Sequence, residues 1–240
     1  MDLKFMEELA RLFSTQLELS NLEYQKKLRR QAELKALQSQ VNPHFLYNAL
    51  NTISFICREN AERARELLLT LASYYRQTLE NEQYMLNLHT ELYHINTYLE
   101  LEKARFEEKL QVTMDIEEDL DCMVPSFILQ PLVENALKYG TDCMPPWNIR
   151  IEGTLFPQGW QITVTDSGNG FSEERLDVIH TRMKEAQART GMPEISLGGM
   201  GLLNVYLRWK FYCPEESVFE CGNTADGHGR VLIGRFMKED

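Results

Sequence analysis

The sequence predicts an α+β protein in which a helical first half precedes a two-layer α/β domain. Residues 1–110 contain one of the eight prolines and none of the thirteen glycines, and these two residue types interrupt helices and form turns. The first half has apolar residues at helical spacing, whereas the second half alternates strand-like and helix-like stretches. A helical region followed by a layered α/β domain accounts for all three observations.

The composition narrows the class of protein. The 240 residues are 43% hydrophobic, enough for one large domain or two small ones. The net charge of −11 argues against a nucleic-acid partner, because such binding depends on basic residues. The five cysteines are irregularly spaced, so we interpret them as reduced thiols of a cytosolic protein. No apolar run is long enough to span a bilayer, and acidic residues near Met1 argue against a signal peptide.

The first half is predicted to contain three helical segments. The first begins at Leu3 and runs to about Ser39, with an apolar stripe that polar residues interrupt, as in an imperfect coiled-coil seam. A turn at "RENAE" joins it to a helix at about 61–80, and a further helix follows at about 88–108. A thin helical hairpin cannot bury its apolar stripe alone, so we expect it to pair with a second copy. The stripe consists of Met6, Phe13, Leu17, Leu34 and Val41.

The second half is predicted to be a mixed sheet covered on one face by helices. We expect Pro125 and Ser126 to open one helix and Gly140 to end it. Ser172 is the expected cap of a helix at 172–188. A hairpin turns at "PQG" between two strands. The expected strands are 111–116, 148–156, 160–166, 217–222 and 229–236, and the last helix is 201–212.

Two short stretches of the second half carry polar groups suited to a nucleotide. In "ENALKYG", Asn135 and Lys138 lie one turn apart on an apolar helix; an amide oxygen can coordinate Mg²⁺ and a lysine can neutralise a phosphate. In "DSGNG", Asp166 can accept a hydrogen bond from an exocyclic amine, and Gly168 and Gly170 let the backbone approach a flat ligand. Taken singly, each has a simpler interpretation, namely a local hydrogen bond of Asn135 and a tight turn after a strand.

A third stretch, "GGMGLLN" (198–204), is a glycine-rich turn that opens a helix. Free backbone N–H groups and the helix dipole at such a turn favour a polyphosphate. Many helix starts look alike, so this stretch alone is weak support. The order and spacing of the three stretches carry more information than any one of them.

Together the three stretches resemble the Bergerat ATP-binding fold of histidine kinases, gyrase-type ATPases, and the chaperone and mismatch-repair ATPases. "LQPLVENALKYG" resembles its N box, "DSGNG" its G1 box and "GGMGLLNV" its G2 box. "LKALQSQVNPHFLYNALNTI" (34–53) and "ELYHINTYLELEKARFEEKL" (91–110) are similar to the sensor histidine kinases of the LytS/YehU and YesM type. The similarity runs from about residue 34 to the C-terminus and implies a helical-hairpin dimerisation region followed by a Bergerat domain.

The resemblance also implies ATP and Mg²⁺ as cofactors, with Asn135 as the magnesium ligand and Lys138 assisting catalysis by neutralising charge. Phe171 to about Leu197 would form a mobile lid over the ATP. The residues that the resemblance assigns to the cofactor site are Asn135, Lys138, Tyr139, Asp166, Gly168, Gly170, Gly199, Gly201, Leu202 and Asn204.

The same resemblance identifies His44 as the phosphoacceptor. A neutral imidazole nitrogen is a competent nucleophile near neutral pH, so we expect His44 to project into solvent, with Pro43 bending the helix there. Asn48, one turn later, would hydrogen-bond the water that removes phosphate from a partner regulator; the alternative is a purely structural hydrogen bond. Phe45 stands where many other histidine kinases carry an acid, so the general base for His44 stays undetermined.

Two other classes of protein share parts of this pattern. An ATP-hydrolysing switch of the gyrase or chaperone kind places a glutamate four residues before the asparagine, where this chain has Pro131, and Glu134 would point elsewhere on the helix. A scaffold without histidine phosphorylation is the second alternative, and the intact cofactor residues argue against it. Two departures from the family stand out: Tyr139 replaces a frequent histidine, and Arg230 replaces a frequent threonine.

The expected domain organisation has three parts. Residues 1–33 would be a signal-transmission coiled-coil helix, 34–85 the dimerisation and phosphotransfer hairpin, and 86–240 the ATP-binding domain. Phosphoryl groups would pass from ATP to His44 and then to an aspartate on a response regulator, within a homodimer. Such kinases usually have a membrane sensor region upstream, so we expect this chain to be a fragment acting on the cytoplasmic side of the cell membrane.

Overall fold

The computed structural model describes residues 42–80, 83–187, 201–213 and 217–236. The chain divides into two compact units, Met1–Leu46 and Tyr47–Asp240. The expected coiled-coil helix at 1–33 lies outside the described residues. The sheet, the helices that cover it and most of the helical hairpin belong to the second unit.

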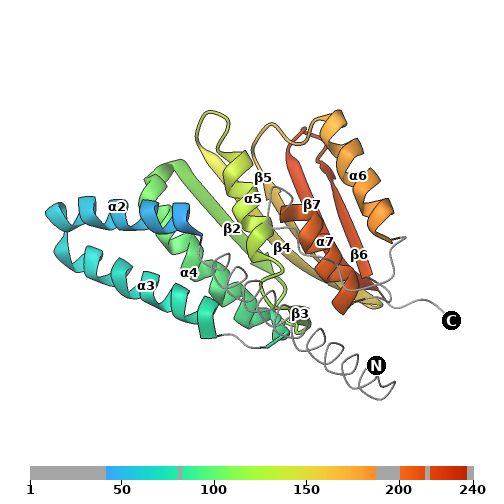
Figure 1. Cartoon of the computed structure of the whole chain (residues 1–240), viewed down its shortest axis with the longest axis horizontal. Helices are drawn as coiled ribbons and strands as arrows, with labels where there is room; N and C mark the ends of the chain where they lie inside the picture. The colour runs from blue at the N-terminus through green and yellow to red at the C-terminus, as the bar shows by residue number, and fades with distance from the viewer. Residues whose placement is uncertain (1–41, 81–82, 188–200, 214–216, 237–240) are drawn as a thin grey trace, which may run out of the picture. The chain divides into compact units, whose positions relative to one another are not determined.

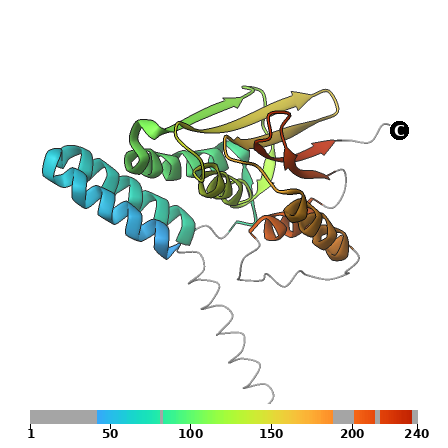
Figure 2. The same cartoon turned by 90° about the horizontal axis from the view of Figure 1, so that it is seen from above.

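The hairpin consists of α2 (Pro43–Glu59) and α3 (Ala61–Glu80), which run antiparallel side by side from Tyr47 on (Figures 1 and 2). Pro43 is the first residue of α2, and the side chain of Asn42 caps the helix by accepting the Phe45 N–H at 3.2 Å. Pro43 therefore begins a helix instead of bending the interior of one, which corrects the expectation. A proline costs little at this position because its missing N–H has no partner in the first turn.

Helix α3 packs on α4 (Leu88–Phe106), so the hairpin is joined to the rest of its compact unit. The Tyr74 and Tyr98 rings lie 6.1 Å apart, and Gln130 donates a 2.8 Å hydrogen bond to the Tyr74 hydroxyl. Leu67 of α3 is completely buried. The predicted division of the chain at residue 85 stays a prediction.

The main sheet has five strands in the order β2-β4-β5-β7-β6. Strand β2 is parallel to β4, and every other pairing is antiparallel. Helices α4, α5 (Gln130–Gly140) and α7 (Gly201–Tyr212) pack on one face, and α6 (Glu173–Gln187) lies against α7 (Figure 2). The strands are β2 (Leu110–Ile116), β4 (Trp147–Phe156), β5 (Gly159–Asp166), β6 (Ser217–Asn223) and β7 (Gly229–Phe236). The predicted two-layer domain is confirmed.

The core lies between this sheet and its helices, because alternate residues of the central strands are buried. Ile149 and Ile151 of β4 and Ile162 of β5 have at most 1% of their surface exposed. Ser172 caps α6 as predicted, since its hydroxyl accepts the Arg175 N–H at 3.3 Å. The turn in "PQG" likewise joins β4 to β5.

The prediction that Pro125 and Ser126 open a helix is wrong. Pro125 ends strand β3 (Met123–Pro125), which pairs antiparallel with β1 (Met85–Asn87), a two-stranded sheet that the sequence did not predict. Helix α5 begins only at Gln130, after a turn in which Phe127 has a φ of +54°. A left-handed residue cannot lie within a helix, so the helix starts beyond it.

A buried acid in α4 predicts a pH-dependent stability. Burial raises the pKa of Glu102, and Arg105, 3.4 Å away, offsets this only in part. The stability that Glu102 contributes is therefore complete below its ordinary pKa of 4.5 and is lost as the pH rises through the folded-state pKa. Glu102→Gln should raise the free energy of unfolding at neutral pH, by about 1.4 kcal/mol for each pKa unit removed.

Urea unfolding at acidic and neutral pH measures this effect. Glu108→Gln is the matched control, because Glu108 is exposed, and it should leave the pH dependence unchanged. Equal destabilisation by Glu102→Gln at both pH values would contradict the assignment.

Candidate functional site

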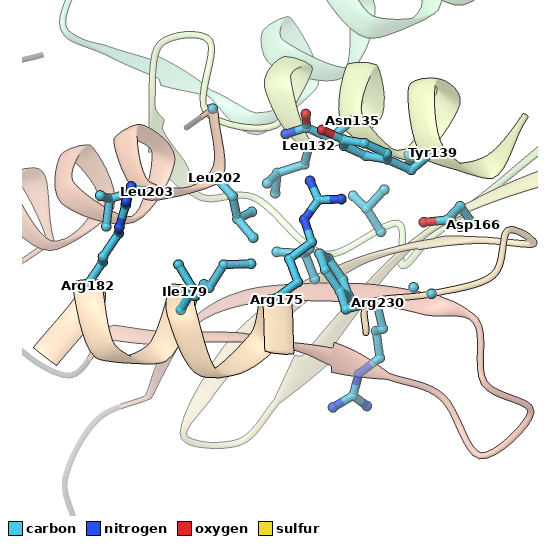
Figure 3. A pocket seen from close by; sticks show the side chains of 18 residues that line it. Leu132, Asn135, Tyr139, Asp166, Arg175, Ile179, Arg182, Leu202, Leu203 and Arg230 are labelled. Carbon is cyan, nitrogen blue, oxygen red and sulfur yellow. The ribbon is translucent and has the colours of Figure 1, made fainter. Parts of the chain in front are cut away.

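A cavity of about 270 Å³ opens between α5, α6, α7 and the ends of the inner strands β5 and β7 (Figure 3). Its walls are largely apolar, with Leu132, Val164 and Ile179 among them, while Asn135 and Asp166 supply polar groups. An apolar cavity with a few polar groups is the usual form of a small-molecule site. The cavity therefore brings together elements that are far apart in the sequence, from α5 to β7.

Asp166 is the last residue of β5, and its carboxylate points into the cavity (Figure 3). One oxygen accepts the Gly168 N–H at 2.9 Å. Burial raises the pKa of Asp166, and the Gly168 N–H and nearby His228 partly offset this. A Cβ on Gly229 would lie 2.5 Å from the other oxygen, so only glycine leaves room for the carboxylate. Asp166 is thus a fixed hydrogen-bond acceptor at one end of the cavity.

The two glycines of "DSGNG" shape the turn that follows Asp166. A Cβ on Gly168 would lie 2.5 Å from the Tyr139 carbonyl oxygen, and Gly170 has a φ of +66°, which disfavours other residues. Gly170 also lines the cavity, whereas Gly168 does not. The stretch is therefore a tight turn and a wall of the cavity at once, so the two interpretations drawn from the sequence are compatible.

Helix α5 brings Asn135 and Tyr139 to the cavity, one turn apart. Lys138 is exposed and does not line the cavity; its ammonium group lies 5.2 Å from the centre of the Tyr139 ring. Glu134 is turned away from the cavity, and its carboxylate accepts a 2.8 Å hydrogen bond from Gln130. The catalytic role of Lys138 stays a prediction.

The start of α5 is held by Glu91 of α4, which is completely buried. Its carboxylate accepts the Phe127 N–H at 2.9 Å and the Leu129 N–H at 3.0 Å. Burial raises the pKa of Glu91, and these N–H groups and Arg208 partly offset that rise. A carboxylate at a helix N-terminus binds N–H groups that otherwise have no partner. Glu91 thereby sets the position of the helix that carries Asn135.

Helix α7 completes the cavity from the far end of the chain. Gly201 and Leu202 line it, and a Cβ on Gly201 would lie 3.4 Å from the Asn135 amide nitrogen. Asn204 lies in the same helix but does not line the cavity, and Gly199 lies outside the described residues. Two stretches more than sixty residues apart in the sequence therefore meet across this site.

The predicted phosphoacceptor His44 is exposed in the first turn of α2. Asn48 follows one turn later in the same helix and is half-buried. Exposure of His44 satisfies the requirement that another group can reach it. The roles predicted for both residues stay predictions.

Two arginines of α6 that line the cavity, Arg175 and Arg182, were missed by sequence reasoning, and Arg230, which also lines it, was noted only as a departure from the family. Arg175 and Arg182 of α6 share a helical face with Ile179, and this i, i+4, i+7 spacing is the signal that could have revealed them. Arg230 of β7 pairs with Glu220 at 3.3 Å, and Figure 3 shows its side chain directed away from the cavity.

Two known families match successive parts of the chain. Residues 32–110 match the family described as histidine kinase. Residues 125–220 match the family described as histidine kinase-, DNA gyrase B-, and HSP90-like ATPase. The second match contains the segments that form the cavity up to α7.

Curated relatives carry sensor kinase names. The chain is 45% identical over 189 residues to the sensor protein LytS of Bacillus cereus, covering 77% of this chain and 32% of that protein. It is 38% identical over 209 residues to the sensor histidine kinase YpdA of Escherichia coli, covering 86% and 35%. It is 35% identical over 236 residues to the sensor histidine kinase/phosphatase LytS of Staphylococcus aureus, covering 94% and 39%. The chain thus spans about a third of the length of these relatives.

Similar solved structures include the catalytic domain of histidine kinase ThkA, at 14% identity and a TM-score of 0.44, covering 65% of this chain and 97% of that one. The Acinetobacter baumannii histidine kinase AdeS matches at 15% identity and a TM-score of 0.40, covering 75% and 82%.

Within the described residues, no helix is both long and apolar enough to cross a bilayer. With the two family regions in this order and relatives at 35–45% identity, the chain belongs to the sensor histidine kinases of the LytS type.

Proposed function

We propose that this chain is the kinase portion of a two-component sensor histidine kinase, which transfers the γ-phosphoryl group of ATP to His44. The observation that carries the proposal is the meeting of Asn135, Asp166 and Gly201 at one cavity. These residues supply a hydrogen-bond acceptor for the exocyclic amine of the base, an amide that can bind a metal ion, and a helix N-terminus for the phosphates. Such groups suit a purine nucleotide. From His44 the phosphoryl group would pass to an aspartate on a response regulator.

Different residues of the cavity hold different parts of the nucleotide. Asp166 accepts a hydrogen bond from the exocyclic amine of adenine, and the apolar walls receive the flat base. The α7 N-terminus at Gly201 faces the phosphates, where its dipole favours negative charge. The Asn135 amide oxygen fits a Mg²⁺ ion, because Mg²⁺ binds through few protein oxygens and takes its other ligands from water and phosphate. When bound, Mg²⁺ neutralises charge that develops during transfer.

An ATP-hydrolysing switch is supported less well. Pro131 occupies the position where such enzymes carry a glutamate that activates water. The neighbouring acid, Glu134, is hydrogen-bonded to Gln130 and does not line the cavity. The exposed His44 in the first turn of α2 has no role in hydrolysis, whereas it suits a phosphoacceptor. A cytoplasmic location beside the membrane belongs to the same proposal.

Incubation of the 240-residue chain with γ-labelled ATP and Mg²⁺ tests the proposal directly. We expect acid-labile label on His44, because phosphohistidine is formed there, and none after His44→Gln. His89→Gln is the control, since His89 is also exposed on a helix, and it should retain the label. Label on the wild type that persists in His44→Gln would refute the assignment of the phosphoacceptor.

Nucleotide affinity tests the cavity independently of phosphotransfer. Asp166→Asn should weaken Mg-ATP binding because the amide presents a donor where adenine needs an acceptor, and Asn135→Ala should remove a metal ligand. Each change should cost about 1.5–3 kcal/mol, roughly tenfold to over a hundredfold in affinity by calorimetry. Asp115→Asn, an exposed change on β2, should leave binding intact. Unchanged affinity in both site variants would remove the basis of the site assignment.

The hairpin is proposed to form the interface of a homodimer. Its two helices expose large apolar side chains, which a second copy would cover: Tyr47, Leu50, Phe55, Leu68 and Leu69. Light scattering should give twice the mass of one chain, and Leu69→Lys should shift the equilibrium toward one chain at micromolar concentration. A wild-type chain that stays monomeric under these conditions would exclude this interface.

A further inference from the structure

The guanidinium group of Arg175 lines the cavity and lies over the ring of Tyr139, although the residue as a whole is exposed. Its central carbon is 4.2 Å from the centre of that ring and 5.9 Å from the centre of the Phe171 ring. Figure 3 shows the side chain rising from the first turn of α6 toward Tyr139. Ser172 caps α6 directly before this turn, so the backbone that carries Arg175 is fixed.

The contacts that Arg175 makes in the unliganded protein are weak enough to be replaced by contacts to a phosphate. Among the residues that the structure describes, no carboxylate forms an ion pair with Arg175. Its charge lies against the Tyr139 and Phe171 rings, and it also interacts with the Tyr139 hydroxyl. Burial acts to raise the pKa of Tyr139, but Arg175 and Lys138 outweigh it, so that this pKa is lowered. A cation over a ring is held more weakly than a guanidinium that makes paired hydrogen bonds to a phosphate.

The position of Arg175 obstructs any ligand that fills the cavity. In Figure 3 the Arg175 guanidinium group lies between Asp166 and Asn135, and a Cβ on Gly201 would lie 3.4 Å from the Asn135 amide nitrogen. A nucleotide that reaches both Asp166 and Asn135 must pass the guanidinium group. The cavity volume of about 270 Å³ is also slightly below the roughly 300–1,000 Å³ of typical ligand pockets, as expected if a side chain fills part of the space.

We propose that Arg175 is a phosphate-binding residue of the nucleotide site, which rests on Tyr139 in the unliganded protein and exchanges that ring for a phosphate group when a nucleotide binds. The proposal rests on the proposed function. An arginine is suited to this exchange, because its planar fork stacks on an aromatic ring and also binds phosphate oxygens in pairs. Removal of Arg175 would clear space for the base while removing a contact to the phosphates.

Calorimetry with adenosine, ADP and Mg-ATP separates these two effects. For Arg175→Ala we expect ADP and ATP to bind about tenfold more weakly or worse, while adenosine affinity stays the same or rises. Arg175→Lys should fall between, because lysine keeps the charge without the fork. Arg150→Ala is the matched control, an exposed arginine on β4 that pairs with Asp115 and Glu152, and it should change none of the affinities.

The outcomes distinguish this inference from the proposed function. A folded wild-type chain that binds none of the three ligands refutes the nucleotide site itself. If the wild type binds ATP but Arg175→Ala weakens adenosine as much as ATP, or weakens neither, then Arg175 does not bind phosphate. Thermal unfolding without ligand verifies that each variant is folded, and Arg175→Gln repeats the test with a neutral side chain of similar length.

Discussion

The cavity depends on one buried carboxylate, that of Glu91, which lies outside the cavity. It accepts N–H groups from Phe127 and Leu129 and so fixes where α5 starts. Arg208 of α7 donates to the carbonyl oxygens of Ser126 and Phe127 on the same turn. Helices α4, α5 and α7 therefore meet at four residues of backbone, and the left-handed Phe127 marks that turn. A buried charge left without these partners would cost several kcal/mol, so these hydrogen bonds should form or be lost together.

A second polar contact joins the hairpin to the same helix. Gln130, the first residue of α5, donates both to the Tyr74 hydroxyl of α3 and to the Glu134 carboxylate. Burial is the main cause of the raised pKa of Tyr74 and of Glu134. Glu134 precedes the cavity residue Asn135 in the chain, so Gln130 joins α3 to the part of α5 that lines the cavity. Buried polar contacts of this kind tolerate little misalignment.

The parts of the fold that depend on local sequence could be predicted, and those that depend on distant contacts could not. The φ of +66° at Gly170 is a requirement of the turn itself, and the glycine pattern was sufficient to locate Asp166. The close approach of Gly168 to the Tyr139 carbonyl oxygen is instead a contact distant in sequence. Pro125 was misplaced because the start of α5 is decided by Glu91, more than thirty residues earlier. Arg175 was missed because it is an exposed arginine in a polar helix, and such residues are ordinarily solvated side chains without a binding role. Nothing in the sequence near Arg175 reveals that Tyr139 will lie beneath it.

Strand order has a consequence for how the cavity is assembled. Strand β7 is synthesised last among the described strands, yet it lies between β5 and β6, and its first residue, Gly229, packs against the Asp166 carboxylate. During translation, the edge of β5 that pairs with β7 therefore stays unpaired until residues 229–236 have left the ribosome. Unpaired edges are exposed to wrong pairing, and such long-range pairing is slow. The site is a late product of folding, and a chain that stops short of β7 would contain Asn135 and Asp166 without a binding site.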